Sequence, residues 1–249
     1  MTSHVVHLGD CLDPVGGLAG LADKSIDHVI TDPPYSRDLY LKFRKNKGAR
    51  GTESIETPNH LALANQRIGA IDDILDEVAA QLCRVVRRWI VVFSDAEIAH
   101  RWRLALGSLY VRAGVWVKPN AVPQISGDRP AQGFESMTIG HAPGPKRWNG
   151  GGRPAVWSVN ATNSQALLRD SADHPCPKPL DLMEALVRDF TDAGETILDP
   201  FAGSGTTGVA CKRLGRSFIG WERDPKYHAI AVKRIENTRE QLGLWTGAA

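Results

Sequence analysis

Short apolar segments of strand length alternate along the chain with longer segments in which apolar residues recur every three or four positions. The first pattern indicates buried strands and the second amphipathic helices, and their alternation is typical of an α/β fold with a mainly parallel sheet. Strands are expected at residues 5–8, 28–31, 89–93, 109–117, 136–140, 196–198 and 217–221. Helices are expected at about residues 15–21, 68–85, 96–106, 180–190, 206–214 and 225–241.

The segments between these elements differ in character. Residues 109–117 and 136–140 are joined by a Pro- and Gly-rich connection, and they are expected to form a hairpin at one edge of the sheet. Residues 36–60 are polar and basic without a clear period, which predicts a mobile loop, and residues 141–177 are again loop-rich. No internal repeat divides the 249 residues, so a single domain over 1–249 is expected.

The composition is ordinary for a globular protein with a sizeable core, because 42% of the residues are hydrophobic and 23% are charged. The longest apolar run, residues 89–93, is far too short to cross a membrane, and the first residues do not resemble a signal peptide. A cytoplasmic location without a membrane partner is therefore expected. The cysteines are widely separated and form no Cys-x-x-Cys pair, which argues against disulfides and against a metal site.

The net charge of +2 is too small to indicate a nucleic-acid partner, but the basic residues are unevenly distributed. One short stretch contains a single acid, Asp38, among six basic residues: Arg37, Lys42, Arg44, Lys45, Lys47 and Arg50. Such a cluster can neutralise backbone phosphates and release their condensed counterions. The alternative interpretation is a solvated loop that keeps the protein soluble.

The first motif with chemical content is Thr-Ile-Leu-Asp-Pro-Phe-Ala-Gly-Ser-Gly-Thr-Thr at residues 196–207. An apolar strand runs into a glycine-containing turn that opens a helix, where small residues let a ligand approach and the helix N-terminus favours an anionic group. Glu222 ends the next strand, and an acid there can accept hydrogen bonds from both ribose hydroxyls. These features suit a cofactor with a ribose and a carboxylate but no pyrophosphate, a description that S-adenosylmethionine fits. A tight turn without a ligand is the alternative.

The second motif is Ile-Thr-Asp-Pro-Pro-Tyr-Ser at residues 30–36. The two consecutive prolines fix an extended conformation that is poor in donors, so the backbone presents carbonyl acceptors. Asp32 adds a side-chain acceptor and Tyr35 an aromatic face. Together these groups could hold a planar amine, with acceptors for its N–H bonds and a ring to stack on the base. A rigid turn with a structural tyrosine fits the isolated tetrapeptide equally well.

Together the two motifs closely resemble the DNA amino-methyltransferases, which form N6-methyladenine and N4-methylcytosine. Asp-Pro-Pro-Tyr precedes Phe-Ala-Gly-Ser-Gly here, as in the circularly permuted beta class of that family. Residues 9–11, 93–95 and 174–179 match further family segments, so the resemblance covers nearly the whole chain. It implies a doubly wound, mainly parallel seven-stranded sheet of the class I S-adenosylmethionine-dependent methyltransferase type.

The resemblance also assigns roles to particular residues. Catalysis is implied for Asp32, Pro33, Pro34 and Tyr35, with Asp32 and the Pro33 carbonyl binding the target amine and Tyr35 stacking on a flipped base. Cofactor contacts are implied for Asp10, Cys11, Asp32, Lys178, Asp199, Phe201, Gly203, Ser204, Gly205, Thr206 and Glu222, with His174 helping to enclose the cofactor. An aspartate at the first motif position favours adenine N6, since cytosine-N4 members usually carry serine there.

Double-stranded DNA is the implied partner, and the stretch at about 118–171 is expected to recognise its sequence. Candidate DNA contacts are Arg37, Lys42, Arg44, Lys45, Lys47, Arg129, Arg147 and Arg153, and Gln132 and Asn149 have side chains that read base edges. A homodimer and a companion restriction endonuclease stay open. So do cytosine-N4 methylation, an RNA or protein N-methyltransferase, and a non-catalytic DNA-binding relative. A nicotinamide-dependent oxidoreductase is disfavoured because no Gly-x-Gly-x-x-Gly fingerprint is present.

Overall fold

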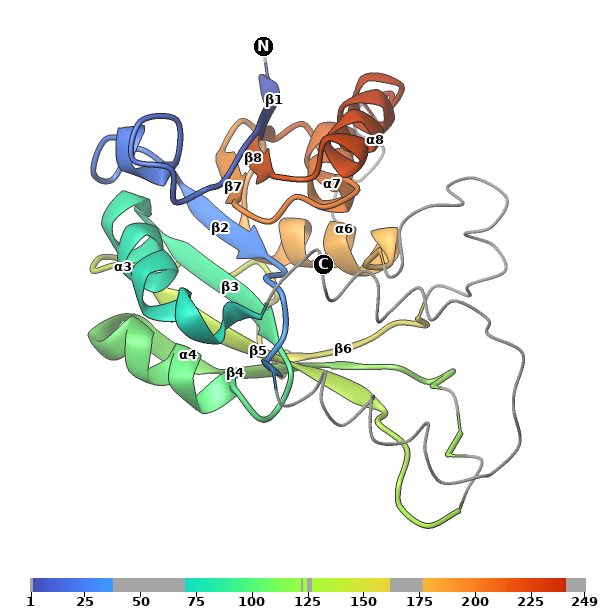
Figure 1. The fold of residues 1–249 in the computed structure, drawn as a ribbon. Coiled ribbons are helices and arrows are strands. Elements are labelled where there is room, and N and C mark those ends of the chain that lie inside the picture. The colour runs from blue at the N-terminus through green and yellow to red at the C-terminus, as the bar shows by residue number, and fades with distance from the viewer. Residues whose placement is uncertain (1, 38–69, 122, 125–126, 162–176, 241–249) are drawn as a thin grey trace.

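The computed structural model describes residues 2–37, 70–121, 123–124, 127–161 and 177–240, which form a mixed sheet between two helical layers (Figure 1). The strands are β1 (His4–Leu8), β2 (His28–Thr31), β3 (Trp89–Ser94), β4 (Tyr110–Val117), β5 (Phe134–His141), β6 (Val156–Ser158), β7 (Thr196–Asp199) and β8 (Ser217–Glu222). Their order in the sheet is β1-β8-β7-β2-β3-β5-β4-β6. The predicted α/β architecture is confirmed.

The helices are α3 (Leu75–Val85), α4 (Ala99–Leu106), α6 (Leu180–Phe190), α7 (Thr206–Arg213) and α8 (Pro225–Glu236), with 3-10 turns η1 (Leu18–Gly20), η2 (Ile71–Asp73) and η3 (Gly107–Leu109). Helix α4 begins three residues later than expected, because Asp95 Oδ1 accepts hydrogen bonds from the amides of Glu97 and Ile98 and holds a turn there. The helix expected at 15–21 is reduced to η1. No helix in the described ranges has the length and apolar composition of a membrane span.

Helices α3 and α4 cover one face of the sheet, and α6, α7 and α8 cover the other (Figure 1). Successive side chains of a strand point to opposite faces, so each central strand contributes to two separate cores. In β3, Val91 and Phe93 pack in the cluster that contains α6 and α7, whereas Ile90 and Val92 pack in the cluster that contains α3 and α4. Burial on both faces explains why this strand is a continuous apolar run.

Strands β7 and β8, from the last third of the chain, lie between β1 and β2. All four strands are parallel. The chain leaves β7 toward β8 on one side and leaves β2 toward β3 on the other, so the direction of winding reverses between β7 and β2. Ligands of doubly wound sheets bind at such a switch point, beyond the carboxyl ends of the strands.

The far side of the sheet carries the predicted hairpin, because β5 runs antiparallel to both β3 and β4. The sheet also has one strand more than the seven expected. Strand β6 pairs in parallel with β4 over three residues, within a segment that the sequence indicated as irregular. Its buried Trp157 donates the indole N–H to Asp189 Oδ2 of α6 at 2.8 Å, which ties this short strand to the helical layer.

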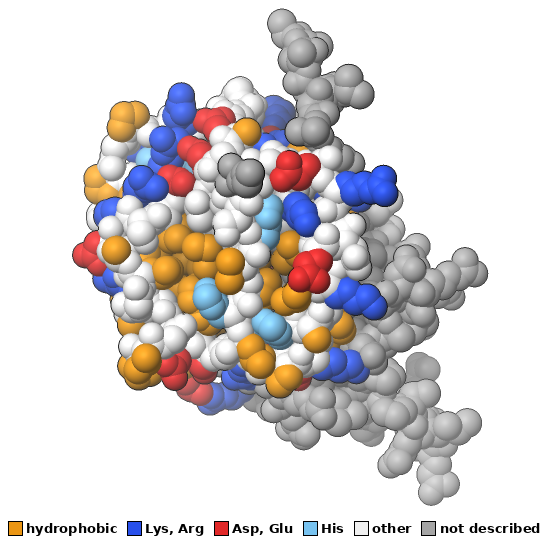
Figure 2. All heavy atoms as spheres, turned by 90° about the horizontal axis from the view of Figure 1, so that it is seen from above, with side chains coloured by type: hydrophobic (Ala, Val, Ile, Leu, Met, Phe, Trp, Pro, Cys, Tyr) orange, Lys and Arg blue, Asp and Glu red, His pale blue; other side chains and the backbone are white. Residues whose placement is uncertain are grey.

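The opposite edge of the sheet is formed by β1, and Figure 2 looks onto this end of the molecule. Hydrophobic and histidine side chains gather on the surface there. Val5 and Leu8 of β1 are 39% and 55% exposed, and His7 stacks on Trp221 of β8 with ring centroids 4.6 Å apart. The β1 edge is therefore more apolar than an ordinary solvated edge strand.

Candidate active site at the carboxyl edge of the sheet

Residues of both motifs meet at the carboxyl edge of the parallel strands. Because β5 is antiparallel, its first residues lie at this same edge. In sheet order the edge carries Asp10 and Cys11 after β1, Glu222 in β8, Asp199 in β7, Asp32 after β2, Asp95 after β3, Glu135 in β5 and Lys118 after β4. The topology thus brings most of the residues singled out from the sequence to one line across the sheet.

Asp199 joins the two motifs. Its Oδ1 accepts hydrogen bonds from the Thr31 hydroxyl at 2.7 Å and from the Phe201 amide at 3.1 Å, and its Oδ2 accepts one from the Thr207 hydroxyl at 2.6 Å. The residue is only 2% exposed, and this burial raises the pKa of its carboxyl to about 6. Both carboxylate oxygens accept hydrogen bonds from the protein, so Asp199 holds β2, β7 and α7 together at the switch point.

The turn after β7 requires glycine for steric reasons. Gly203 and Gly205 have φ angles of +53° and +81°, in the left-handed region that favours glycine. A Cβ atom on Gly205 would lie 2.9 Å from Cα of Ala231 in α8. The turn is therefore packed directly against α8, with no space for a side chain at its last position.

Arg234 of α8 binds the same turn. Its guanidinium donates to the Ser204 carbonyl at 2.6 Å, to the Ser204 hydroxyl at 2.8 Å and to the Thr206 hydroxyl at 3.3 Å. Ser204 and Thr206 were expected to line a cofactor, and in the structure both hydroxyls accept hydrogen bonds from α8. The sequence did not single out Arg234, because a basic residue on a surface helix carries no local signal of such a contact.

Glu222 closes the other side of the turn. Its Oε2 accepts a hydrogen bond from the Gly203 amide at 2.9 Å, and its Oε1 accepts one from the Asp224 amide at 2.8 Å. Burial raises the pKa of its carboxyl above the ordinary value, with the two amides acting in the opposite direction. The carboxylate is thus positioned against the glycine turn at the end of β8, where the motif predicts contact with a ribose.

Asp10 and Cys11 follow the neighbouring edge strand. The Gly9 amide donates to the Glu222 carbonyl at 3.0 Å, so this segment lies beside the end of β8. Asp10 is exposed and accepts a hydrogen bond from the Leu12 amide at 2.9 Å. Cys11 is buried, and burial raises the pKa of its thiol to about 12, which makes it an unreactive apolar side chain at neutral pH.

The loop that carries Asp32 leaves β2 at the switch point, and its far end is held by Asp95, whose Oδ2 accepts a hydrogen bond from the Ser36 amide at 2.8 Å. Asp32 Oδ2 accepts a hydrogen bond from Lys178 Nζ at 2.6 Å. Its Oδ1 is buried and has no hydrogen-bond partner within the part of the chain that the structure describes. Burial raises the pKa of the Asp32 carboxyl against the opposing pull of the Lys178 ammonium.

Lys178 connects Asp32 to a residue that the sequence did not indicate, Glu135 of β5. The three N–H donors of its ammonium have three acceptors: Asp32 Oδ2 at 2.6 Å, the Tyr35 oxygen at 3.1 Å and Glu135 Oε2 at 3.1 Å. The Tyr35 hydroxyl in turn donates to Glu135 Oε2, and Lys118 Nζ binds Glu135 Oε1 at 2.5 Å. Lys178 was expected to contact the cofactor, and in the structure its ammonium binds Asp32 of the Asp-Pro-Pro-Tyr loop.

Burial and charge act in opposite directions on this network. Burial would raise the pKa of Glu135, but the ammonium groups of Lys178 and Lys118 outweigh it and lower that pKa to about 2. Burial would lower the pKa of Lys178, but Asp32 and Glu135 outweigh it and raise that pKa. Burial and the two nearby carboxylates raise the pKa of Tyr35 well above its ordinary value. Glu135 and Lys178 are therefore charged at neutral pH, and Tyr35 is neutral.

The expected DNA contacts are divided between the two ends of the sheet. Arg37 lies at the active-site edge, where its guanidinium binds Asp73 of η2 at 2.6 Å, and Arg129 lies in the connection from β4 to β5 at the same edge, 2.9 Å from Asp128. Both arginine side chains are about half exposed, at 57% and 47%. Four of the expected contacts and one cofactor neighbour lie outside the described residues: Lys42, Arg44, Lys45, Lys47 and His174.

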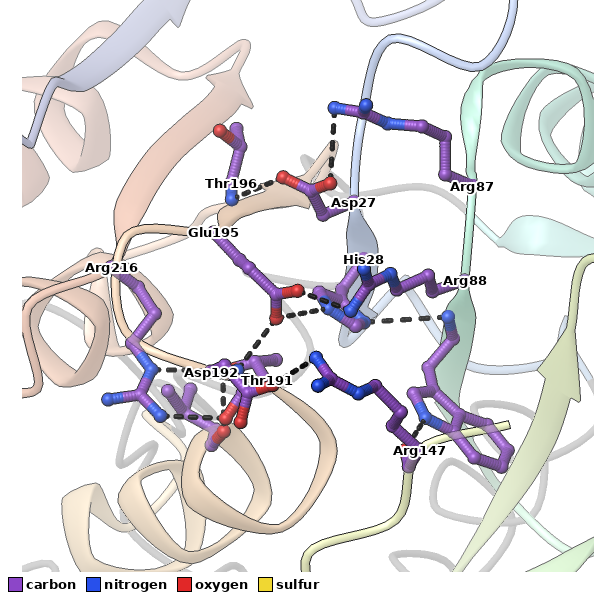
Figure 3. Close-up of polar contacts among 12 residues, drawn as sticks. Asp27, His28, Arg87, Arg88, Arg147, Thr191, Asp192, Glu195, Thr196 and Arg216 are labelled. Atoms are coloured by element: carbon purple, nitrogen blue, oxygen red, sulfur yellow. Dashed lines mark hydrogen bonds and ion pairs between the residues drawn. The ribbon is translucent and has the colours of Figure 1, made fainter. Parts of the chain in front are cut away.

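Arg147, by contrast, lies at the amino ends of the parallel strands. It forms an ion pair with Asp192 at 3.0 Å, in a polar cluster that also contains His28, Arg88 and Glu195 (Figure 3). Its carbonyl accepts the indole N–H of Trp89, the first residue of β3. Arg147 therefore helps to organise the end of the sheet opposite Asp32.

Two further candidates for base recognition, Asn149 and Arg153, lie with Arg147. The Asn149 amide side chain donates to the Arg188 and Thr191 carbonyls at the end of α6, and Arg153 binds Asp189 at 2.5 Å. The expected recognition region at 118–171 is thus not one surface: its first part follows β4 at the active-site edge, whereas the connection from β5 to β6 lies at the opposite edge.

Comparison with known proteins agrees with this geometry. The Type II methyltransferase M.HinfI of Haemophilus influenzae is 24% identical over 93% of this chain and 68% of its own length. The Type II methyltransferase M.Cfr9I of Citrobacter freundii is 33% identical over 54% of this chain, which spans about half (49%) of that relative.

Solved structures share the fold. The complex of M1.HpyAVI with SAM has a TM-score of 0.65 at 23% identity and covers 92% of this chain and 98% of its own. The PvuII DNA methyltransferase, described as cytosine-N4-specific, has a TM-score of 0.69 at 18% identity and covers 94% and 86%.

A family model for DNA methylases of the N6/N4 type matches residues 26–233, from just before the strand that leads to Asp32 into the last described helix. With both motifs inside that match and at one edge of the sheet, the chain belongs to the N6/N4 DNA methylase family.

Proposed function

We propose that this protein is a site-specific DNA methyltransferase that transfers a methyl group from S-adenosylmethionine to the N6 amino group of adenine. The observation that carries this proposal is the unequal hydrogen bonding of the two carboxylate oxygens of Asp32. One of its oxygens is held by Lys178, while Oδ1 is buried without a partner in the described part of the chain. A buried acceptor in this state favours a ligand donor, because leaving it unmatched costs about 1–3 kcal/mol.

We place S-adenosylmethionine at the switch point between β7 and β2. Glu222 offers a carboxylate for the ribose hydroxyls, and the turn with Gly203 and Gly205 lets a ligand approach its backbone. Asp10 and Cys11 lie beside Glu222, in the position that we assign to the adenine of the cofactor. Phe201 and the start of α7 complete the methionine side of the site. When bound, the cofactor supplies an electrophilic methyl group on a sulfonium centre.

The residues of the Asp-Pro-Pro-Tyr loop orient the target amine. In the proposed complex Asp32 Oδ1 accepts one amine N–H and the Pro33 carbonyl accepts the other, while Pro34 keeps the loop extended. This arrangement points the nitrogen lone pair toward the methyl group, and alignment of this kind is the main contribution to rate. Because burial raises the pKa of Asp32, its carboxylate can also take up the proton that the amine loses.

The target base must leave the DNA duplex to reach Asp32, because its amino group is inaccessible inside the stack. We assign to Tyr35 the stacking contact with the flipped base. Its ring is held in place through its hydroxyl, which binds both Lys178 and Glu135. Arg37, Arg129 and the basic residues at positions 42–47 would contact the backbone phosphates, since those in the described residues lie at the active-site edge.

Adenine is favoured by the aspartate at the first position of the loop, where cytosine-N4 members of the family usually carry serine. Cytosine N4 is the second candidate, because the PvuII enzyme, described as cytosine-N4-specific, shares the fold over most of the chain. The two amines have the same geometry around nitrogen, so the hydrogen-bond acceptors of the loop fit both. The shape of the base pocket has to separate them.

Product analysis tests the proposal directly. The purified full-length protein is incubated with unmethylated DNA and labelled S-adenosylmethionine, and the DNA is digested for nucleoside mass spectrometry. We expect labelled N6-methyladenine. N4-methylcytosine would overturn the choice of base, and labelling of RNA or protein without labelling of DNA would overturn the substrate class.

A variant pair tests the role of Asp32. Asp32→Ala should abolish methyl transfer while S-adenosylmethionine binds within about threefold of its wild-type affinity, because the target amine and not the cofactor is its partner. Asp181→Asn is the matched control, since Asp181 is an exposed carboxylate in the first turn of α6, at the same edge of the sheet. Equal losses of binding and transfer in Asp32→Ala would assign Asp32 to the cofactor site instead.

A further inference from the structure

Glu135 is the second residue of β5, and it faces the Asp-Pro-Pro-Tyr loop across the active-site edge. Its side chain is only 14% exposed and binds three other side chains: Lys178, Lys118 and Tyr35. Of these partners, Tyr35 belongs to the Asp-Pro-Pro-Tyr loop and Lys178 binds that loop through Asp32. Nothing in the reaction itself requires a second carboxylate at this place, so its contacts need another explanation.

The first explanation is charge balance. Asp32 and Glu135 carry two negative charges, and Lys178 and Lys118 carry two positive charges, all within one chain of contacts no longer than 3.1 Å. Without Glu135 the network would hold one excess positive charge beside Asp32. Methyl transfer moves positive charge from a sulfonium onto the amine that Asp32 binds, so excess positive charge there would oppose the reaction.

The second explanation concerns the direction in which the Lys178 ammonium donates its hydrogen bonds. Lys178 has three N–H donors, and one of them is used by Glu135. If Glu135 were removed, the freed donor would have an unmatched acceptor close by, Asp32 Oδ1, on a carboxylate that Lys178 already binds through Oδ2. Lys178 would then occupy the oxygen that the target amine needs. Glu135 draws the ammonium away from that oxygen and also fixes the hydroxyl end of the Tyr35 ring.

We propose that Glu135 is a positioning residue for methyl transfer: it restrains Lys178 and Tyr35 and thereby keeps Oδ1 of Asp32 open for the target amine. This inference rests on the proposed function of the same site. A purely structural role would confine Glu135 to joining β4 and β5 through Lys118, so its loss would shift the pKa of Asp32 only by removing one nearby charge. The positioning role adds the turn of Lys178 toward Asp32, which lowers that pKa further, and the shift can be measured without cofactor or DNA.

The decisive measurement is the titration of Asp32 in the cofactor-free, full-length protein, followed by NMR of ¹³C-labelled carboxyl groups and assigned with Asp32→Asn. Glu135→Gln removes a negative charge near Asp32 and turns Lys178 more fully toward it. Both changes favour the ionised carboxylate, so the pKa of Asp32 should fall by about one unit or more. Asp181→Asn should leave it within about 0.2 units of wild type. An unchanged Asp32 titration in Glu135→Gln would overturn the proposal.

A second variant separates charge from packing. Glu135→Asp keeps the negative charge on a shorter side chain, so the pKa of Asp32 should stay closer to wild type than in Glu135→Gln. Equal shifts in the two variants would mean that Asp32 responds to disturbed packing, and the positioning role would be wrong. Thermal unfolding of each variant confirms that the compared proteins are folded.

Kinetics provide the independent arm, using whichever base the wild type methylates. Glu135→Gln should lower kcat about tenfold or more, with KM for S-adenosylmethionine within about twofold of wild type, because β2 and β3 separate β5 from the proposed cofactor site at β7. In a Lys178→Met background the same change should cost less than about threefold, since Glu135 acts through Lys178. If the losses of kcat caused by Glu135→Gln and by Lys178→Met were fully additive, Glu135 would not act through Lys178. Failure of the proposed function would appear separately, as absent methylation of DNA by the wild type, whatever the titration gives.

Discussion

Thr31 at the end of β2 donates its hydroxyl hydrogen to Asp199 at the end of β7 over 2.7 Å, although the two residues are 168 positions apart in the chain. The bond lies where the direction of winding reverses. It joins the strand that leads into the Asp-Pro-Pro-Tyr loop to the strand that leads into the glycine turn. Any shift of one strand along the other would break it, so the bond sets the position of the Asp-Pro-Pro-Tyr loop relative to the glycine turn.

Replacement of Thr31 should therefore lower stability as well as activity. Thr31→Val keeps the shape of the side chain but leaves Asp199 without one of its three donors, and the free energy of unfolding should fall by about 1–3 kcal/mol. Urea denaturation monitored by fluorescence measures this loss. Thr196→Val, on the same strand as Asp199, is the control, because its hydroxyl has no hydrogen bond among the described residues. Equal losses in the two variants would contradict the role of the bond.

Asp199 should also make stability depend on pH in the acidic range. Its folded-state pKa of about 6 is above the ordinary 3.8, so between these values the folded protein binds more protons than the unfolded chain. The stability contributed by Asp199 is therefore fully present below about pH 4 and is lost as the pH rises through 6. A difference of about two units corresponds to at most about 3 kcal/mol.

Asp199→Asn removes this titration. The difference in unfolding free energy between wild type and variant should shift in favour of the variant as the pH rises from about 4 to 7. Denaturant unfolding at several pH values across this window measures the shift. A difference that stays constant with pH would show that Asp199 keeps an ordinary pKa in the folded protein.

Arg234 should control cofactor affinity indirectly, through the glycine turn that it binds. Arg234→Met removes the hydrogen bonds to Ser204 and Thr206 that hold the glycine turn against α8, so the turn loses its fixed geometry. We expect S-adenosylmethionine binding, measured by calorimetry, to weaken about tenfold, equivalent to about 1.4 kcal/mol. Lys233→Met removes a positive charge from the neighbouring, exposed position of α8 and should leave binding unchanged. Similar losses of S-adenosylmethionine affinity in the two variants would indicate a general effect of charge on α8.

Two arginines expected to bind DNA should behave differently. Arg129→Gln, at the active-site edge, should weaken DNA binding and reduce the dependence of affinity on salt by about one phosphate contact. Arg147→Gln, at the opposite end of the sheet, should leave both unchanged and only lower stability slightly, through its partly exposed ion pair with Asp192. Fluorescence anisotropy with a short duplex at several salt concentrations compares the two. An equal change in salt dependence would place DNA on both ends of the protein.

The elements found from the sequence are those whose signal is local. Strand β3 is buried on both faces, so its sequence is an uninterrupted apolar run. The turn at Gly203 to Gly205 needs glycine for its backbone angles. The order of the two motifs also matches the observed sheet, in which β7 and β8 lie between β1 and β2. Patterns of this kind can be recognised in a single sequence, because each one depends only on residues that are close together in the chain.

The features that the sequence did not indicate depend on contacts between distant segments. Glu135 and Lys178 are separated in sequence by the rest of β5 and by β6, and neither has a neighbour in sequence that marks the contact. Strand β6 has only three residues and is stabilised by pairing with β4 and by Trp157, so its own period is too short to recognise. Arg147 and Arg129 have similar loop surroundings, and only the topology assigns them to opposite edges.

The position of β1 has a consequence for synthesis of the protein. Its only neighbour in the described sheet is β8, and the first paired residues are His4 and Phe218. On the ribosome, β1 must therefore stay unpaired until β8, which follows the other described strands in sequence, has been translated. Long-range pairing of this kind slows folding and leaves apolar strands open to wrong partners for longer. Val5 and Leu8 would be exposed throughout that interval, so β1 of the nascent chain should depend on chaperone protection until β8 emerges.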